Sequence, residues 1–152
     1  MKNKPFSLKA RLKSFKYAFN GLKILIKNEH NSRIHLLVTI CVIAAGFILN
    51  ISKLEWIVVV LTIGFVFTTE IINSAIEYIA DFISPERNDL IKSAKDLAAG
   101  AVLVSAISAV VIGIIIFLPK IMERIWNFIR NRVTEIYAIR NLYRETQIHL
   151  KN

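Results

Sequence analysis

Residues 54–83 read LEWIVVVLTIGFVFTTEIINSAIEYIADFI, a run that is apolar in its first half and carries acidic groups in its second. As one helix this run would be about 45 Å long, so its end should protrude beyond the hydrocarbon of a bilayer. Residues 34–51 form an apolar run before it, and residues 97–118 form another after it. Three such runs predict an all-α integral membrane protein with three transmembrane helices.

Composition and charge agree with this class. The chain has 152 residues, of which 55% are hydrophobic, and a formal net charge of +9. High hydrophobicity excludes a disordered chain, and the single cysteine, Cys41, excludes a disulfide framework. Residues 1–33 carry a net +8 and residues 119–152 a net +4, around a middle of −3. Basic ends can indicate nucleic acid, but beside long apolar runs they favour anionic lipid headgroups, and no nucleic-acid partner is expected.

Residues 7–27 predict a separate amphipathic helix ahead of the first span. Its apolar side chains are spaced 4, 3, 4, 3 and 4 residues apart, at Leu8, Leu12, Phe15, Phe19, Leu22 and Ile26. This spacing forms one narrow stripe, with Lys and Arg largely off it, which is the pattern of a helix lying in the membrane interface. A helix packed on a protein partner, or in a coiled-coil seam, would show the same stripe.

The connections and the basic residues indicate topology. Residues 50–53 are a tight link that makes the first two spans antiparallel, and residues 84–96 are a polar loop. An N-terminus inside places twelve Lys and Arg residues in the cytoplasm and eight outside. Pro119 is expected to stop the third helix. We therefore divide the chain into a membrane domain of residues 1–120 and a basic extension of residues 121–152. The extension has apolar residues near helical spacing, at Met122, Ile125, Ile129, Val133, Ile136 and Tyr143.

Polar residues gather on one face of the second span. Glu70, Asn73, Ser74, Glu77 and Asp81 fall within an arc about 100° wide on a helix. Ionisable groups at membrane depth are costly, and like charges on one face need a cation, protons or a basic partner. Asp81 alone, like many acids at a helix end, is more simply solvated.

Three more charged residues can converge on this face. Glu29 precedes the first span, and Lys95 and Asp96 precede the third. A site with only oxygen ligands suits Mg²⁺ rather than zinc or copper. His30, His35 and His149 have no partners at metal-ligand spacing, so solvated or interfacial positions are expected for them. Cys41 is most simply a small apolar residue of the first span.

Several motifs resemble one known family. The segment 70–81, the tripeptide 94–96 with the run 98–102, and Tyr17, Gly21-Leu22 and Asn28-Glu29 together resemble the prokaryotic diacylglycerol kinase / undecaprenol kinase family. The resemblance covers about residues 8–120. The Ala-Ala-Gly-Ala-Val run at 98–102 and the Ile-Ile-Phe-Leu-Pro-Lys sequence ending at Lys120 resemble its Gram-positive branch, whose members are mostly undecaprenol kinases.

The resemblance implies an activity and an assembly. It implies a multi-pass lipid kinase of the bacterial cytoplasmic membrane, assembled as a homotrimer, that uses ATP and Mg²⁺ to phosphorylate undecaprenol or diacylglycerol. The sequence contains no GxxxxGK[ST] motif, so a soluble-kinase phosphate loop is not expected. From the residues alone, a channel or scaffold with no enzymatic activity stays open as the alternative, because intramembrane carboxylates could line a cation path.

The resemblance also assigns roles to individual residues. Glu70 would be the general base that meets the lipid hydroxyl, Asn73 would support it, and Glu29 and Glu77 would hold Mg²⁺. Ala99 lies where the family approaches the lipid. The positions that match the nucleotide site are Tyr17, Glu29, Glu77, Glu86, Arg87, Asn88, Lys95 and Asp96.

The chain departs from the family pattern at four positions. Ala80 replaces a usual valine, and Asn88 stands where histidine is common. Ala10 stands where some members have an arginine, so that Arg11 or Lys9 would have to substitute. His35 stands where the branch that uses diacylglycerol tends to have glutamate, which favours a polyprenol acceptor.

Overall fold

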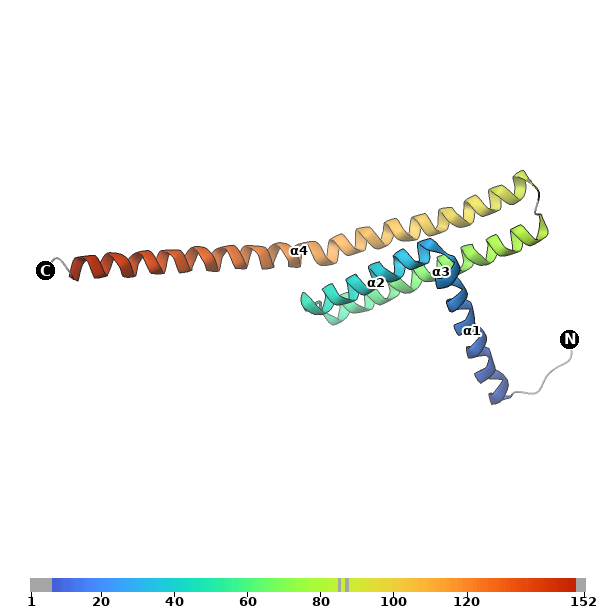
Figure 1. Cartoon of the computed structure of the whole chain (residues 1–152), viewed down its shortest axis with the longest axis horizontal. Helices are drawn as coiled ribbons and strands as arrows, with labels where there is room; N and C mark the ends of the chain where they lie inside the picture. Colours follow the sequence, from blue (N-terminus) through green and yellow to red (C-terminus); the bar gives the residue numbers. More distant parts are fainter. Residues whose placement is uncertain (1–6, 85, 87, 150–152) are drawn as a thin grey trace.

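The computed structural model describes residues 7–84, 86 and 88–149, with side chains described at 7–8, 11–84, 86 and 88–141. Four helices make up this part of the chain (Figure 1). They are α1 (Leu8–Asn28), α2 (His30–Ile48), α3 (Lys53–Ile83) and α4 (Asp89–His149). The helices α2, α3 and α4 pack lengthwise, while α1 leaves the bundle at a steep angle (Figure 1). The expectation of an all-α protein is confirmed.

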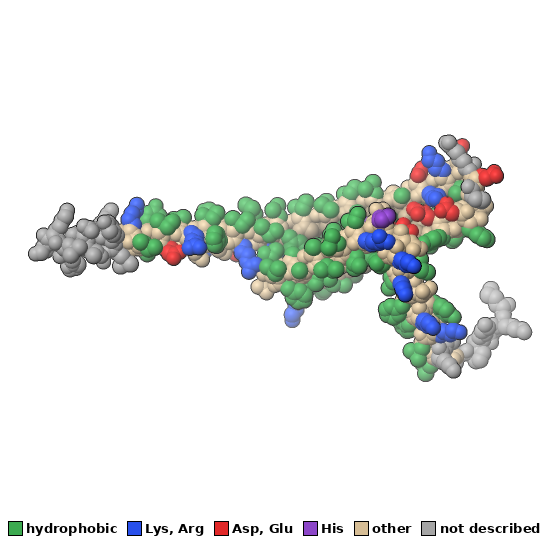
Figure 2. Space-filling model, viewed as in Figure 1, with side chains coloured by type: hydrophobic (Ala, Val, Ile, Leu, Met, Phe, Trp, Pro, Cys, Tyr) green, Lys and Arg blue, Asp and Glu red, His purple; other side chains and the backbone are tan. Residues whose placement is uncertain are grey.

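The helices α2, α3 and α4 are each long and apolar enough to cross a membrane. Their outer faces carry exposed Ile, Leu, Val and Phe side chains, which cover much of the bundle in the space-filling view (Figure 2). Apolar surface of this extent is not stable in water, and it matches the acyl chains of a bilayer. The three predicted spans therefore correspond to three helices.

The turn between α2 and α3 holds the apolar core at one end of the bundle. Asn50 has a φ of 49°, in the left-handed region that asparagine tolerates. Ser52 and Glu55 form a capping box, in which each side chain accepts a hydrogen bond from the other's backbone N–H. Ile51, Val59 and Ile116 are buried beside this turn. The predicted tight link is confirmed, and α2 and α3 run antiparallel (Figure 1).

The polar loop expected at 84–96 is shorter in the structure. The helix α4 begins at Asp89, so residues 89–96 are helical. The side-chain Oδ1 of Asn88 accepts hydrogen bonds from the backbone N–H of Leu90 at 2.9 Å and of Ile91 at 3.3 Å. These bonds satisfy two N–H groups of the first helical turn, which explains why the helix begins so early.

The expectation that the third helix stops at Pro119 is wrong. Pro119 lies inside α4, which continues to His149. Proline has a φ suited to a helix and removes one backbone hydrogen bond, a cost that the flanking turns can offset. Two contacts hold the helix just beyond it, from Lys120 Nζ to Glu55 Oε2 at 3.2 Å and from Arg124 Nη1 to the carbonyl of Ile48 at 3.0 Å.

Gly46 allows the closest packing of this core. A Cβ built on Gly46 would lie 2.8 Å from Cη2 and 2.9 Å from Cζ2 of Trp56. We expect Gly46→Ala to displace the indole and destabilise the protein by about 1–3 kcal/mol. The matched control is Gly64→Ala, whose Cβ would have no heavy atom within 4 Å. It should be neutral or stabilising, since alanine favours a helix by up to about 1 kcal/mol. Thermal unfolding in detergent measures both variants, and equal midpoints would contradict the packing.

Candidate active site

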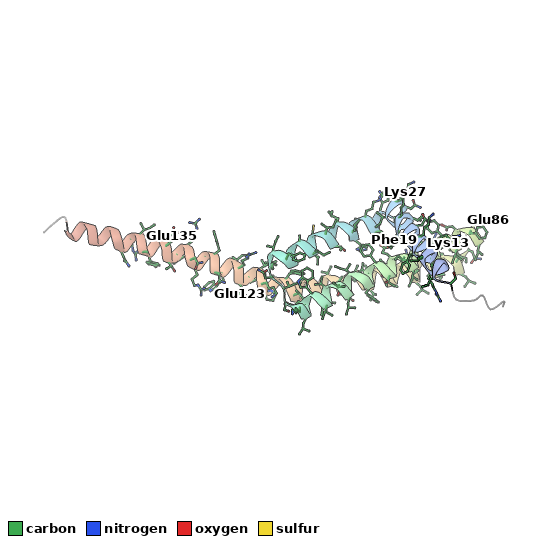
Figure 3. The ribbon with its side chains drawn as sticks, turned by 90° about the horizontal axis from the view of Figure 1, so that it is seen from below. Lys13, Phe19, Lys27, Glu86, Glu123 and Glu135 are labelled. Atoms are coloured by element: carbon green, nitrogen blue, oxygen red, sulfur yellow. The ribbon has the colours of Figure 1, made fainter. Side chains whose placement is uncertain are left out.

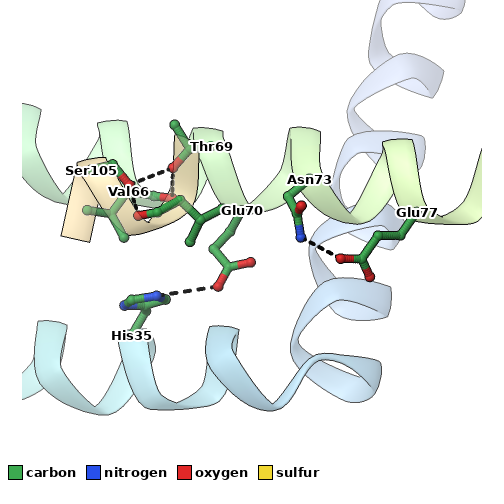
Figure 4. A network of polar contacts seen from close by, with 8 residues as sticks. His35, Val66, Thr69, Glu70, Asn73, Glu77 and Ser105 are labelled. Carbon is green, nitrogen blue, oxygen red and sulfur yellow. Dashed lines mark hydrogen bonds and ion pairs between the residues drawn. The ribbon is translucent and has the colours of Figure 1, made fainter. Parts of the chain in front are cut away.

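Glu70 is the most deeply buried ionisable group in the described part of the chain. It lies in the middle of α3 with 2% of its surface exposed. His35 of α2 places Nε2 3.3 Å from Glu70 Oε1 (Figure 4). A buried carboxylate needs such a partner, because its desolvation costs several kcal/mol. The contact therefore joins α2 to α3 at the level of the site.

The predicted polar face of α3 is present. Asn73 Nδ2 donates to Glu77 Oε1 at 2.9 Å, one turn along the helix (Figure 4). Ser74 is buried on the same side of α3. The negative charges of Glu29 and Glu77 both act on the carboxylate of Glu70. The structure thus places Glu29, which precedes α2, within electrostatic range of the carboxylates of α3.

Several oxygen atoms of this region have no hydrogen-bond partner. They are Glu70 Oε1, Asn73 Oδ1, Ser74 Oγ and Ser32 Oγ, all buried. His35 is within ion-pair distance of Glu70 Oε1, but the geometry of that contact is not that of a hydrogen bond. Unsatisfied buried acceptors are costly in a native protein and commonly mark a place for a ligand, an ion or water. This cluster can accept a proton or coordinate a hard cation.

The junction between α1 and α2 positions Glu29. Arg33 donates from Nε to the carbonyl of Ile26 at 2.9 Å and from Nη2 to the carbonyl of Lys27, so it satisfies the end of α1. Asn28 Nδ2 donates to the hydroxyl of Tyr78 at 2.8 Å, which ties the same junction to α3. Because Tyr78 follows Glu77 directly, this bond holds Glu29 near the acidic face of α3.

Lys95 reaches the predicted polar face of α3 at Asp81. Its Nζ lies 2.8 Å from Oδ1 of Asp81, joining α4 to α3. Asp81 was expected to be solvated, and its side chain is 68% exposed in this pair. An exposed ion pair contributes little to stability, so Lys95 can exchange Asp81 for another anion at low cost.

Hydroxyl groups fix α3 against α4 beside Glu70. Thr69 Oγ1 and Ser105 Oγ lie 2.9 Å apart, and both also bond to backbone carbonyls of their own helices (Figure 4). Ser105 is 1% exposed. Since Thr69 precedes Glu70, this contact sets the position of the carboxylate along α4.

Four other predicted site residues are exposed in the single chain. Tyr17 on α1 and Asp96 and Ala99 on α4 are exposed. Glu86 is exposed in the α3–α4 connection, at the end of the bundle (Figure 3). In the described ranges, no hydrogen bond or ion pair is recorded between any of these four and the Glu70 cluster. Asn88 caps α4, and Arg87 lies outside the described residues.

Sequence reasoning underestimated His35, for which a solvated or interfacial position was expected. Its side chain is 22% exposed and contacts Glu70. The available signal was the cost of an ionisable side chain within a span, which makes any such residue a candidate for the site. Arg33 and Tyr78 gave no comparable signal, because their bonds depend on the angle between α1 and α2.

The donor set fits a cation held together with a phosphorylated ligand. In the part of the chain that is described, no three His, Cys, Asp or Glu side chains come close enough to hold a metal ion by themselves. Mg²⁺ is usually bound by one or two carboxylates, water and substrate phosphates, not by an all-protein cage. Glu29 and Glu77 supply two carboxylates, whose oxygen atoms are the kind of ligand that Mg²⁺ prefers.

An apolar groove runs from the site along the bundle. It has a volume of about 340 Å³ and is lined by side chains of α2, α3 and α4, from Ile34 and His35 at one end to Phe117 at the other. Val38, Val66 and Ala109 are among the apolar residues between these ends. The groove therefore connects His35, the residue beside Glu70, to an apolar surface between the helices.

Comparison with known proteins identifies the relatives of this chain. A family model described as prokaryotic diacylglycerol kinase matches residues 16–117. The undecaprenol kinase of Bacillus subtilis (strain 168) is 40% identical over 109 residues, covering 72% of this chain and 89% of that protein. A diacylglycerol kinase of Synechocystis sp. is 37% identical, covering 74% of this chain and 65% of its own length. A diacylglycerol kinase of Haemophilus influenzae is 34% identical, with coverages of 70% and 91%.

Proposed function

Since this chain belongs to the prokaryotic diacylglycerol kinase family and is a lipid kinase, we propose that it transfers the γ-phosphate of ATP to the hydroxyl of undecaprenol. The observation that carries the proposal is the buried Glu70 beside the apolar groove, with an oxygen that accepts no hydrogen bond. A carboxylate at this depth can meet a hydroxyl whose hydrocarbon stays in the membrane. A soluble acceptor would not need an ionisable group placed there.

The groove and His35 favour undecaprenol over diacylglycerol. The apolar groove reaches His35, so a hydrocarbon chain that lies in it can bring a terminal hydroxyl to this residue. Among the reported relatives, the undecaprenol kinase has the higher identity, at 40% against 37% and 34% for the two diacylglycerol kinases. Diacylglycerol, whose phosphorylation would give phosphatidic acid, is the second candidate acceptor.

The transfer itself needs one proton acceptor and close alignment. The Glu70 carboxylate takes the proton of the lipid hydroxyl as the oxygen attacks the γ-phosphorus. The bond from that phosphorus to the bridging oxygen breaks, and ADP leaves with the electron pair. His35 holds the carboxylate in place, and Asn73, three residues farther along α3, donates to Glu77. Phosphoryl transfer depends mostly on such positioning and on charge neutralisation.

Glu29 and Glu77 would hold Mg²⁺ in this proposal, with the junction bonds of Arg33 and Asn28 keeping them close. Bound Mg²⁺ supplies positive charge to the phosphate oxygens. When the nucleotide binds, the Lys95 ammonium leaves Asp81 and contacts a phosphate oxygen instead. The remaining proposed nucleotide contacts are Tyr17, Glu86, Arg87, Asn88 and Asp96. Asn88 uses its oxygen in the cap of α4, which leaves its amide N–H groups for the nucleotide.

The assembly that we propose is a homotrimer with the N-terminus of each chain inside and α1 in the membrane interface. The exposure of Tyr17, Asp96 and Ala99 supports more than one copy, since these side chains are open to a neighbour. A neighbouring copy can bring such residues to the open side of the site. The Lys and Arg residues visible along α1 suit the anionic headgroups of the inner leaflet (Figure 2).

The first test replaces the base. We expect Glu70→Gln to lower lipid phosphorylation by about a hundredfold or more, because a general base contributes a factor of 10² to 10⁴. The amide keeps the shape of the side chain, so the thermal midpoint should stay near that of the wild type. Glu123→Gln, on the exposed part of α4, is the matched control and should retain full activity. A Glu70→Gln protein with activity within twofold of the wild type would refute the assignment.

The second test concerns the cation. ATP with Mg²⁺ should raise the thermal midpoint of the wild type, because a ligand that binds only the folded state stabilises it. EDTA should remove most of that shift. Glu77→Gln should need roughly tenfold more Mg²⁺ for the same shift, since about 1.4 kcal/mol of binding is lost with one carboxylate. The control is Glu135→Gln, and an identical Mg²⁺ dependence in both variants would exclude Glu77 from the cation site.

A further inference from the structure

From Phe128 to Asn141, every side chain of α4 is exposed in a single chain. Residues 121–141, here called the α4 extension, project beyond the bundle as one helix (Figure 1). Every side chain in this extension is exposed except Asn127. The extension also lies beyond the family match, which ends at residue 117. The activity of the family therefore does not explain it.

Ten of the exposed side chains in the extension are large and apolar. They are Ile121, Met122, Ile125, Trp126, Phe128, Ile129, Val133, Ile136, Tyr137 and Ile139. On a helix these residues occupy one half of the circumference, and most of the charged residues occupy the other half. An apolar face of this size requires a cover.

The base of the extension is fixed in line with the bundle. Lys120 binds Glu55, and Arg124 binds the carbonyl of Ile48, so both ends of the α2–α3 turn hold the helix after Pro119. The side chains farther along point to all sides with no other helix beside them, as Glu135 shows (Figure 3). The extension is about 32 Å long and continues the direction of a membrane span, which carries its apolar face away from the bilayer.

The apolar residues follow a heptad repeat. With Met122 at position a, Ile129 and Ile136 are the next two a positions. Positions d are Ile125, Arg132 and Ile139, and the outer positions b, c and f are mostly polar. A repeat of seven with apolar a and d positions is the pattern of a coiled-coil seam. The one polar d residue, Arg132, would fix the register at some cost in stability.

The flanking charges match a second copy of the same helix. Glu135 occupies position g, and Arg140 occupies the following position e. In a parallel coiled coil these two positions face each other across neighbouring helices and form salt bridges. Within one chain Glu135 contacts Arg132 at 3.3 Å, but both side chains are at least 60% exposed, so this pair is easily exchanged.

From these observations, we propose that the α4 extensions of three or more copies of this chain form a parallel coiled coil outside the bilayer, at the end of the bundle away from Glu70. Copies of one membrane protein present this helix at the same height and in the same direction, which is what a parallel, in-register coil requires. Isoleucine at both a and d favours three or four strands over two. Trp126 and Val133 at positions e and Phe128 at position g are also apolar. They widen the face that the coil would bury, which likewise favours more than two helices.

Site-directed crosslinking in membranes tests this arrangement. Cys41, the only cysteine, is first replaced by alanine. Ile129→Cys then places a thiol at position a, and Thr134→Cys places one at position f on the opposite side of the same helix. After mild oxidation, we expect covalent dimers from Ile129→Cys at a yield at least fivefold above that from Thr134→Cys. Lipid phosphorylation by both variants confirms that the membrane domain is folded.

A charge exchange gives a second, independent measurement. In the Ile129→Cys background, Glu135→Arg places like charges at facing positions and should lower the crosslinking yield severalfold. Adding Arg140→Glu restores the opposite pair and should recover the yield. Absence of crosslinking at position 129, or equal crosslinking at 129 and 134, would overturn the proposal. So would quenching of a fluorophore at position 129 by brominated lipids, because the extension would then lie on the membrane.

Discussion

The buried carboxylate of Glu70 is the constraint on which the rest of the structure depends. A charged group at membrane depth costs several kcal/mol unless it is paired, so the surrounding helices must supply partners. His35 does so from α2, and the hydroxyl contact between Thr69 and Ser105 fixes α3 against α4 beside it. The groove that reaches His35 gives this group access to the hydrocarbon phase. In the proposed mechanism, burial and function meet at this one residue, because a membrane-bound substrate approaches it from the hydrocarbon phase.

The placement of Glu29 comes from the ends of helices and not from their interiors. Glu29 lies in the extended link between α1 and α2, where Arg33 satisfies the carbonyls of α1 and Asn28 reaches Tyr78. At the opposite end of the bundle, the capping box of Ser52 and Glu55 also receives Lys120 of α4. Each turn thus contacts a helix that is distant in the sequence. Such contacts let a bundle with a small buried core hold a defined geometry.

The sequence predicted the spans, the amphipathic first helix and the face of α3, because all three depend on helical periodicity. Its errors lie where a local signal competes with tertiary contacts. Pro119 predicts the end of a helix, but the contacts of Lys120 and Arg124 hold α4 in place on the far side of the proline. Residues 89–96 are polar and predict a loop, but the side chain of Asn88 caps the helix that begins at residue 89, so they belong to α4. The pairings of His35 with Glu70 and of Lys95 with Asp81 join different helices, and no spacing within one segment could reveal them.

The central claim is that the hydroxyl presented to Glu70 belongs to a polyprenol. The most direct measurement offers undecaprenol and diacylglycerol together, at equal mole fraction, to the purified protein in mixed micelles with labelled ATP and Mg²⁺. The account predicts that most of the label appears in undecaprenyl phosphate. Label found mainly in phosphatidic acid would contradict the assigned acceptor and leave the mechanism in place, whereas label in neither lipid would contradict the role of the Glu70 site in phosphoryl transfer.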